Sequence, residues 1–247
     1  MSSKDDNPAD AAQHALQQFL HTVSHDLSEP IRQVVSFGEI LKEEESSRLS
    51  DDGRLYLEAV IAAGSRMQDM LGGLLQISRV ASRGQLFTPC DLGELIALEL
   101  EALESRIEAA GARVECGVLP TAEGDAAQLR IVLHQLLDNA LKFARPGVPP
   151  VIRIHAAADA EPGWMRLLVQ DNGIGFDMLY AEKVFEVFQR LDPQGDRSGV
   201  GVGLSLCRSI CDRHGGRIFV FTSNQQGTSM CIELPLVQGG GTASRRN

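Results

Sequence analysis

Residues 131–143 read IVLHQLLDNALKF and combine the two faces of one helix. The apolar face, which begins one turn earlier, consists of Leu129, Leu133, Leu136 and Ala140. The opposite face carries Gln135, Asn139 and Lys142 at positions i, i+4 and i+7. Asp125 and Gln128 form a D-x-x-Q pattern just before this stretch, which predicts a capping box at the start of a helix that ends near Ala144. We therefore expect a half-buried helix with a polar row along one side.

The sequence on both sides of this helix mixes strands with other helices. Strand-like runs occur at residues 113–116, 151–156, 164–170, 217–222 and 229–234. Helical spacing predicts further helices at residues 91–110 and 204–214. Residues 177–200 contain glycines and are expected to form a long loop, with a helical turn at residues 181–188. Because most strands lie in the second half, we expect an α+β sandwich with helices on one face of a mixed sheet.

The first 84 residues follow a different pattern. Residues 11–45 repeat apolar side chains at helical spacing, and a second such stripe follows the polar break at residues 46–53 and fades at Gly84. The short connection predicts an all-α two-helix hairpin with antiparallel helices. Because two helices alone cannot enclose both stripes, we expect two hairpins to pair as a four-helix bundle, which makes the protein a homodimer.

Composition and charge exclude several classes of protein. The formal net charge of -10 and the pI of about 5.1 argue against binding nucleic acid or an anionic membrane through a general basic surface. No apolar run approaches the roughly 18 residues of a membrane span, and residues 1–10 lack the apolar segment of a signal peptide. We expect a soluble, cytoplasmic chain. The cysteines, an odd number without metal-site spacing, are expected to be reduced and mostly buried: Cys90, Cys116, Cys207, Cys211 and Cys231.

His25 lies in the run SHDLSEPIR, roughly opposite the apolar stripe of the first helix, so its imidazole is expected to face solvent. Exposure alone does not single it out, because His14 and His21 share the polar side. A neutral imidazole nitrogen is a nucleophile, and the carboxylate of Asp26 can accept the proton from the other nitrogen. Pro30 removes the helical hydrogen bond to the carbonyl of Asp26, so the helix can bend below the histidine.

Three further stretches fit a bound Mg-nucleotide, although each alone also fits an ordinary solvated face or turn. Asn139 offers a neutral oxygen to Mg²⁺ and Lys142 a donor to phosphate. In DNGIGFD, Asp171 can accept a hydrogen bond from an exocyclic amine, while Gly173 and Gly175 allow a tight turn. The string GVGVGL at residues 199–204 leads directly into a helix, whose free N–H groups favour phosphate.

Taken together and in this order, the motifs resemble those of the two-domain sensor histidine kinases. SHDLSEP is similar to their H box, LLDNALKF to the N box, DNGIGFD to the first glycine box, VFEVFQRL to the F box and GVGVGL to the second glycine box. The resemblance covers residues 15–236 and is strongest to the branch that includes phytochrome-type kinases. It implies a dimerisation and histidine phosphotransfer hairpin at residues 8–84, an ATP-binding catalytic domain of the Bergerat type at residues 87–237 and a flexible tail at residues 238–247.

The resemblance also implies roles for single residues. His25 would be the phosphoacceptor and Asp26 its base, with Mg²⁺ on Asn139, phosphate on Lys142 and the adenine amine on Asp171. Gly173 and Gly175 would shape the base pocket, and Phe143 would flank the adenine. The phosphates would lie against Gly199, Gly201, Gly203 and Leu204, and Arg190 would stabilise the transferring charge. The implied partners are a response-regulator receiver domain, a second copy of the chain, and an upstream sensor domain or protein.

Two positions depart from the family pattern. Gln135 stands where relatives usually have a second Asn, so the geometry around Mg²⁺ is expected to be weaker or water-mediated. Glu29 stands four residues after the histidine, where many relatives carry the Thr or Asn that orients a hydrolytic water. This second difference puts phosphatase activity in doubt.

The main hypothesis is an enzyme that autophosphorylates His25 from Mg-ATP and passes the phosphoryl group to a response-regulator aspartate. One alternative is a non-catalytic phosphorelay adaptor that accepts phosphate at His25 while its second domain no longer uses ATP. Another is an ATPase module of the chaperone or topoisomerase type, which leaves the hairpin and His25 without a purpose. Retention of Asn139, Asp171 and the glycines favours the enzyme.

Overall fold

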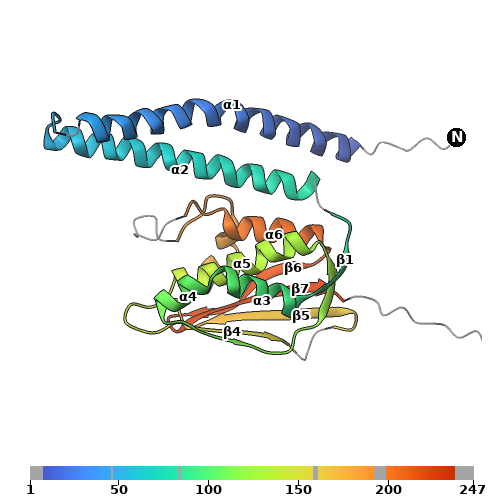
Figure 1. The fold of residues 1–247 in the computed structure, drawn as a ribbon. Helices are drawn as coiled ribbons and strands as arrows, with labels where there is room; N and C mark the ends of the chain where they lie inside the picture. Colours follow the sequence, from blue (N-terminus) through green and yellow to red (C-terminus); the bar gives the residue numbers. More distant parts are fainter. Residues whose placement is uncertain (1–7, 46, 83–84, 158–160, 192–198, 237–247) are drawn as a thin grey trace, which may run out of the picture.

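The computed structural model describes residues 8–45, 47–82, 85–157, 161–191 and 199–236; the side chains of residues 8–25 and 81–82 are not among those described. Two long helices, α1 (Pro8–Glu45) and α2 (Asp51–Ser82), run side by side, and a body of helices and strands lies against α2 (Figure 1). The predicted helical hairpin followed by an α+β domain is confirmed. The expected tail at residues 238–247 lies outside the described residues.

Small residues let the two helices of the hairpin approach closely. A Cβ built on Gly64 would lie 2.6 Å from Cγ2 of Val35, and one built on Gly38 would lie 2.7 Å from Cγ1 of Ile61. Apart from this seam the hairpin buries little. Large apolar side chains remain exposed on both helices, among them Leu27, Val34, Phe37, Ile40, Leu41, Leu55, Tyr56, Val60 and Met67. A single hairpin therefore leaves a wide apolar surface in contact with water.

The second body is a five-stranded mixed sheet with helices on one face (Figure 1). The strand order is β2 (Arg113–Cys116), β4 (Val151–Ala156), β5 (Trp164–Asp171), β7 (Gly227–Pro235) and β6 (Arg217–Asn224), with β2 parallel to β4 and the other pairs antiparallel. The helices are α3 (Leu92–Ala102), α4 (Glu104–Ala110), α5 (Ala126–Lys142) and α6 (Gly203–Arg213). A separate ribbon pairs β1 (Thr88–Asp91) with β3 (Thr121–Gly124). Single turns of 3-10 helix span Met178–Tyr180 and Lys183–Phe185.

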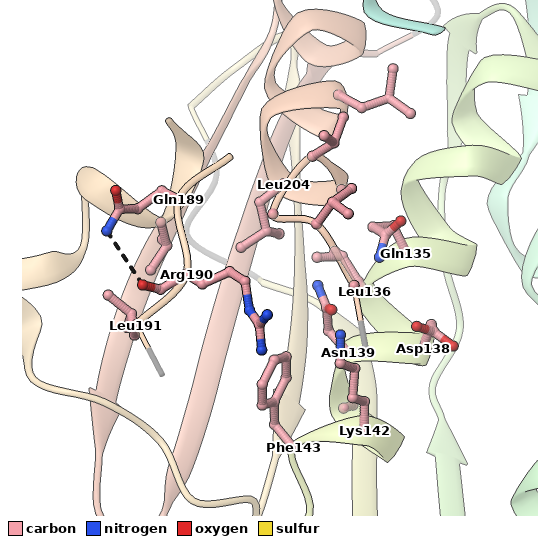
Figure 2. Close-up of a pocket in the computed structure, with 18 of the residues that line it drawn as sticks. Gln135, Leu136, Asp138, Asn139, Lys142, Phe143, Gln189, Arg190, Leu191 and Leu204 are labelled. Carbon is pink, nitrogen blue, oxygen red and sulfur yellow. Dashed lines mark hydrogen bonds between the residues drawn. The ribbon is translucent and has the colours of Figure 1, made fainter. Parts of the chain in front are cut away.

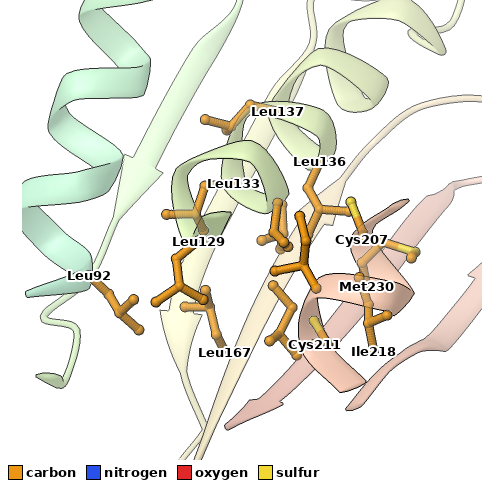
Figure 3. Packing of buried hydrophobic residues seen from close by; sticks show 14 of the residues in the cluster. Leu92, Leu129, Leu133, Leu136, Leu137, Leu167, Cys207, Cys211, Ile218 and Met230 are labelled. Atoms are coloured by element: carbon orange, nitrogen blue, oxygen red, sulfur yellow. The ribbon is translucent and has the colours of Figure 1, made fainter. Parts of the chain in front are cut away.

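The core lies between α5, α6 and the sheet, and Figure 3 shows its centre. Leu129 of α5 lies next to Leu167 of β5, and Leu136 of α5 lies beside Cys207 of α6. All cysteines are free, and all but Cys116 are buried, as the sequence predicts. Burial raises the pKa of Cys211 to about 12, so this thiol is a small apolar side chain rather than a nucleophile.

Three details differ from the sequence-based expectations. The helix expected at residues 91–110 is interrupted at Leu103, which is buried and has φ −101° and ψ 4°. Strands β1 and β3 were not expected. The capping box is half wrong, because Asp125 caps α5 by accepting from the N–H groups of Ala127 and Gln128, but Gln128 does not reach back to it. The N–H of Asp125 instead donates to Nε2 of His214, at 2.9 Å.

Hydrogen bonds tie the end of the hairpin to the second body. Gln128 of α5 donates from Nε2 to the carbonyl of Val80 in α2 (3.4 Å), and it accepts at Oε1 from Arg213 of α6 (2.9 Å). Arg213 also donates to the carbonyl of Gln85, whose N–H donates to Oδ2 of Asp125 at 2.6 Å. The connector between the two halves is therefore anchored at the start of α5 and the end of α6.

Among the described residues, no helix is long and apolar enough to span a membrane.

Candidate functional site

Helix α5 delivers its polar row to a cavity of ≈ 1010 Å³ beside the N-terminal end of α6 (Figure 2). Leu129 and Leu133 are buried in the core, whereas Gln135, Asn139 and Lys142 line the cavity. Leu136 and Ala140 lie between these two faces, because they are buried and also line the cavity. The helix ends at Lys142, with Phe143 as its C-cap, and both residues line the cavity. The two-faced helix predicted from the sequence is confirmed.

Asp171 lines the cavity at the end of β5, the central strand of the sheet. Its Oδ1 accepts from the N–H of Gly173 at 2.8 Å and from that of Thr228 at 3.2 Å. Burial raises the pKa of this carboxyl, and the two backbone donors oppose the rise. Oδ2 accepts no hydrogen bond from the described part of the chain, so it is the free acceptor of the site.

The turn after Asp171 depends on its glycines. At Gly173 an added Cβ would lie 2.5 Å from the carbonyl oxygen of Phe143. At Gly175, where φ is +58°, it would lie 1.6 Å from the carbonyl oxygen of Asn224. No other residue fits either position, so the glycines bring this turn against the end of α5 and the β6–β7 hairpin.

The glycine string places backbone N–H groups at the other end of the cavity. Gly199 lies beside the ammonium of Lys142, since a Cβ on it would be 2.7 Å from Nζ. Gly203 is the first residue of α6, and its Cα packs against the amide of Gln135. Val202, the N-cap, gives this helix no side-chain cap. The free N–H groups and the positive end of the helix dipole therefore favour the binding of an anion at this position.

Two cationic side chains, Lys142 and Arg190, lie near one aromatic ring, that of Phe143. Figure 2 shows the guanidinium of Arg190 pointing toward the ring of Phe143, near Asn139 and Lys142. The ammonium of Lys142 lies 5.2 Å from the centroid of the same ring. Leu204 lines the cavity from α6. Residues 192–198, which separate Arg190 from the glycine string, lie outside the described residues.

Asp26 is not among the described residues that line the cavity. His25 and Asp26 both lie within α1, and the carboxylate of Asp26 is exposed. The side chain of His25 is outside the described residues, so its predicted exposure stays a prediction. The two groups of residues proposed from the sequence therefore lie in different halves of the molecule.

Several residues that line the cavity could not be predicted from the sequence. Arg106 of α4 forms an ion pair with Asp138 of α5 beside it. One wall comes from α2 and consists of Gln68, Asp69, Gly72, Gly73 and Gln76. These residues reach the cavity through the packing of α2 on α6, and no local pattern predicts that contact.

The few protein oxygens in the cavity suit a divalent cation whose other ligands come from the substrate and from water. Among the described residues, no group of three or more His, Cys, Asp or Glu side chains could hold a metal ion. Mg²⁺ typically keeps several waters and binds one or two protein oxygens together with substrate phosphates. The amide oxygen of Asn139, near the N-terminal end of α6, can serve as such a ligand.

Comparison with known proteins identifies the family. Residues 15–83 match the model of the His Kinase A (phospho-acceptor) domain, and residues 124–238 match that of the histidine kinase-, DNA gyrase B- and HSP90-like ATPases. The chain belongs to the sensor histidine kinases. Its hairpin and its α/β body correspond to the two parts of this kinase core.

Relatives of the kinase core include phytochrome-type proteins, as the motifs suggested. It is 31% identical to the phytochrome-like protein Cph1 of Synechocystis over 90% of the chain, and 31% identical to cyanobacterial phytochrome A of Nostoc over 94%. The chain spans only 29% and 30% of the length of these relatives.

Solved structures give the same result. Full-length ShkA in complex with AMPPNP matches with a TM-score of 0.64 and 26% identity, over 88% of this chain and 45% of that one. The mycobacterial sensor histidine kinase MprB matches with a TM-score of 0.51 and 29% identity, over 61% of this chain and 97% of that one.

Proposed function

We propose that the kinase core binds Mg-ATP in the cavity, phosphorylates His25 and passes the phosphoryl group to an aspartate of a response regulator. The observation that carries this proposal is the content of the cavity. It combines a half-buried carboxylate with a free oxygen, an amide oxygen, two cationic side chains and an uncapped helix N-terminus. ShkA, a relative with the same fold, was solved with an ATP analogue.

The adenine would lie at the end of β5. Oδ2 of Asp171 would accept from the exocyclic amine, while Gly173 and Gly175 leave room for a flat ring. The ring of Phe143 would cover one face of the base. This end of the site would therefore discriminate adenine from guanine, which presents a carbonyl at the corresponding position.

The triphosphate would lie between α5 and α6. Lys142 and the N–H groups from Gly199 to Gly203 would bind its oxygens, and Arg190 would approach the transferring group. Mg²⁺, held by Asn139, would neutralise part of the phosphate charge. Lys142 lies at the end of α5 and Gly203 at the start of α6, so the backbone that carries these donors is in place before the substrate arrives.

His25 would attack the γ-phosphorus through one imidazole nitrogen, and ADP would leave. Asp26 would accept the proton from the other nitrogen, because the ring must shed a proton as the N–P bond forms. The bond missing at Pro30 would let α1 bend, so that the imidazole could face first the nucleotide and later the receiver domain. Both steps require the two halves of the core to move relative to each other.

The unit that performs this chemistry would be a dimer. The exposed apolar residues of α1 and α2 would be covered by the same face of a second hairpin, as in a four-helix bundle. The hairpin at residues 8–84 would thus combine dimerisation with phosphoacceptance, and residues 87–237 would form the ATP-binding half. The sensor input would come from another domain or protein.

Incubation of the purified protein with γ-labelled ATP and Mg²⁺ tests this function against its alternatives. A kinase gives acid-labile label on histidine. A phosphorelay adaptor gives no label and no phosphate release. An ATPase module releases free phosphate without labelling the protein. The proposal fails if either of the last two results is obtained.

A further inference from the structure

Helix α2 closes one side of the nucleotide cavity, although it belongs to the other half of the molecule. Gly73 is the contact point: a Cβ built on it would lie 2.6, 2.7 and 2.8 Å from Cγ1, Cγ2 and Cβ of Val202. Because Val202 is the N-cap of α6, this contact fixes α2 at the phosphate end of the cavity rather than at the adenine end. Figure 1 shows the start of α6 lying directly beside α2.

The wall that α2 contributes carries one charge, and it is negative. Asp69 lies one turn before Gly73 on the same face of the helix, and both line the cavity. The other lining residues of α2 are Gln68, Gly72, Gly73 and Gln76. Within the described part of the chain, no hydrogen bond or ion pair compensates the carboxylate of Asp69.

Among the described residues, the cationic side chains that line the cavity all come from the second body. Lys142 and Arg190 lie at the phosphate end, and Arg106 is paired with Asp138. A bound triphosphate would therefore be attracted by the body that holds it and repelled by α2. The repulsion would grow with the negative charge of the nucleotide and would decrease with ionic strength.

We propose that Asp69 makes nucleotide binding and docking of α2 compete, and that it does so more strongly for ATP than for ADP. This inference rests on the proposed function, because it assumes that the cavity binds nucleotide. Linkage makes the effect reciprocal: docking weakens the affinity for ATP, and ATP weakens docking by the same factor. Loading with ATP would then free the ATP-binding half to move toward a histidine, whereas ADP would allow it to return to α2.

The test uses the full chain and measures dissociation constants by calorimetry for ADP and for a non-hydrolysable ATP analogue, both with Mg²⁺. Asp69→Asn should tighten binding of the analogue by about fivefold, a typical size for coupling between two sites. It should tighten ADP binding less, and the difference should shrink at high salt. Asp52→Asn, which removes the same charge from an exposed position in the first turn of α2, is the matched control.

A second variant separates the charge from the docking. Gly73→Leu introduces a side chain where Val202 already lies, so α2 can no longer pack against the start of α6. The α2 helix should still form, because Leu has a higher helix propensity than Gly. In this background Asp69→Asn should no longer change the affinity for the analogue. Equal effects of Asp69→Asn on both nucleotides, or an undiminished effect in the Gly73→Leu background, would overturn the inference. If the parent chain binds neither nucleotide, the proposed function itself fails.

Discussion

Asp171 has one oxygen committed to the fold and one directed to the cavity. Asp171→Asn keeps the size of the side chain but replaces an acceptor by a mixed donor and acceptor. We expect selectivity for ATP over GTP to fall by at least about tenfold, the size of effect that an unpaired polar group produces in a binding site. Competition binding with ATP and GTP measures it, and Asp177→Asn, an exposed change in the same motif, is the control. Unchanged selectivity would remove Asp171 from the adenine site.

Asn139 is expected to act on the chemical step more than on binding. Asn139→Ala removes the oxygen proposed for Mg²⁺, so autophosphorylation should fall by about 10²-fold or more, while nucleotide is still held through Asp171. Rate and affinity are measured separately, by label incorporation and by calorimetry. An unchanged rate would mean that Gln135 or a water molecule holds Mg²⁺ instead. Gln135 is a specific candidate because its side chain also ends in an amide oxygen and is longer than that of Asn.

Glu29 bears on a second activity, the removal of phosphate from the regulator. Its carboxylate accepts hydrogen bonds from Arg32, at 2.9 Å in the shortest, and from Gln33 at 3.2 Å. A carboxylate near a phosphoryl group adds like charge, so we expect little or no phosphatase activity even with Arg32 beside it. The measurement is loss of phosphate from a phosphorylated regulator mixed with ADP and the His25→Gln variant, which cannot take the group back. Rapid loss that disappears when Glu29→Ala is added would instead make Glu29 a general base.

At the level of the elements, the end of α6 and the start of α5 are joined by a neutral histidine. His214 accepts from the N–H of Asp125 at Nε2, and its Nδ1 hydrogen bonds to the carbonyl of Ile210. Burial lowers the pKa of His214 below its ordinary value of 6.5, and the neighbouring Arg213 lowers it further. The side chain of Phe87 from the connector stacks on the ring, with centroids 4.6 Å apart. A protonated ring could not accept at Nε2, so protonation opposes this packing.

The direction of the pH effect follows from that shift. Above pH 6.5 the imidazole is neutral in both the folded and the unfolded chain, and its contribution is fully present. As the pH falls below 6.5, the unfolded chain takes up the proton first, so stability is lost until the pH passes the lowered pKa of the folded chain. We expect the free energy of unfolding in urea to fall between pH 7 and 5.5, by up to about 1.4 kcal/mol per pH unit. His214→Gln should flatten this slope and His155→Gln should not; equal slopes would contradict the account.

The sequence predicted the elements well where a single period runs through them. Strands β2 and β4 have the expected bounds, and α5 and α6 are each within two residues. The four-residue strands β1 and β3, TPCD and TAEG, were missed because each is short and its buried side chains are small. Cys90 is the buried residue of β1, and Ala122 and Gly124 are the buried residues of β3. The interruption at Leu103 was also hidden, since an apolar residue continues the helical spacing across it. Gln128 left its predicted cap because Val80 and Arg213, distant in the sequence, satisfy both ends of its amide.

At the level of the whole molecule, the sequence predicted one side of the cavity and missed the other. Residues Asn139, Lys142 and Asp171 belong to ordered motifs, and the structure brings them together. Asp69 and Gly73 belong to no motif, because their place in the cavity depends on how α2 docks. Because the phosphoacceptor and the nucleotide site belong to different halves of the molecule, each must be tested by its own variant.

The central claim is that ATP bound in the cavity of one half donates its γ-phosphoryl group to His25 in the other half. Labelling of a His25→Gln variant tests this claim most directly. After incubation with γ-labelled ATP and Mg²⁺, this variant should carry no acid-labile label, while its affinity for the ATP analogue should stay within about twofold of the parent chain because no nucleotide contact is lost. His21→Gln, one helical turn away on the same polar side, should be labelled normally. Acid-labile label that persists on the His25→Gln variant would contradict the account.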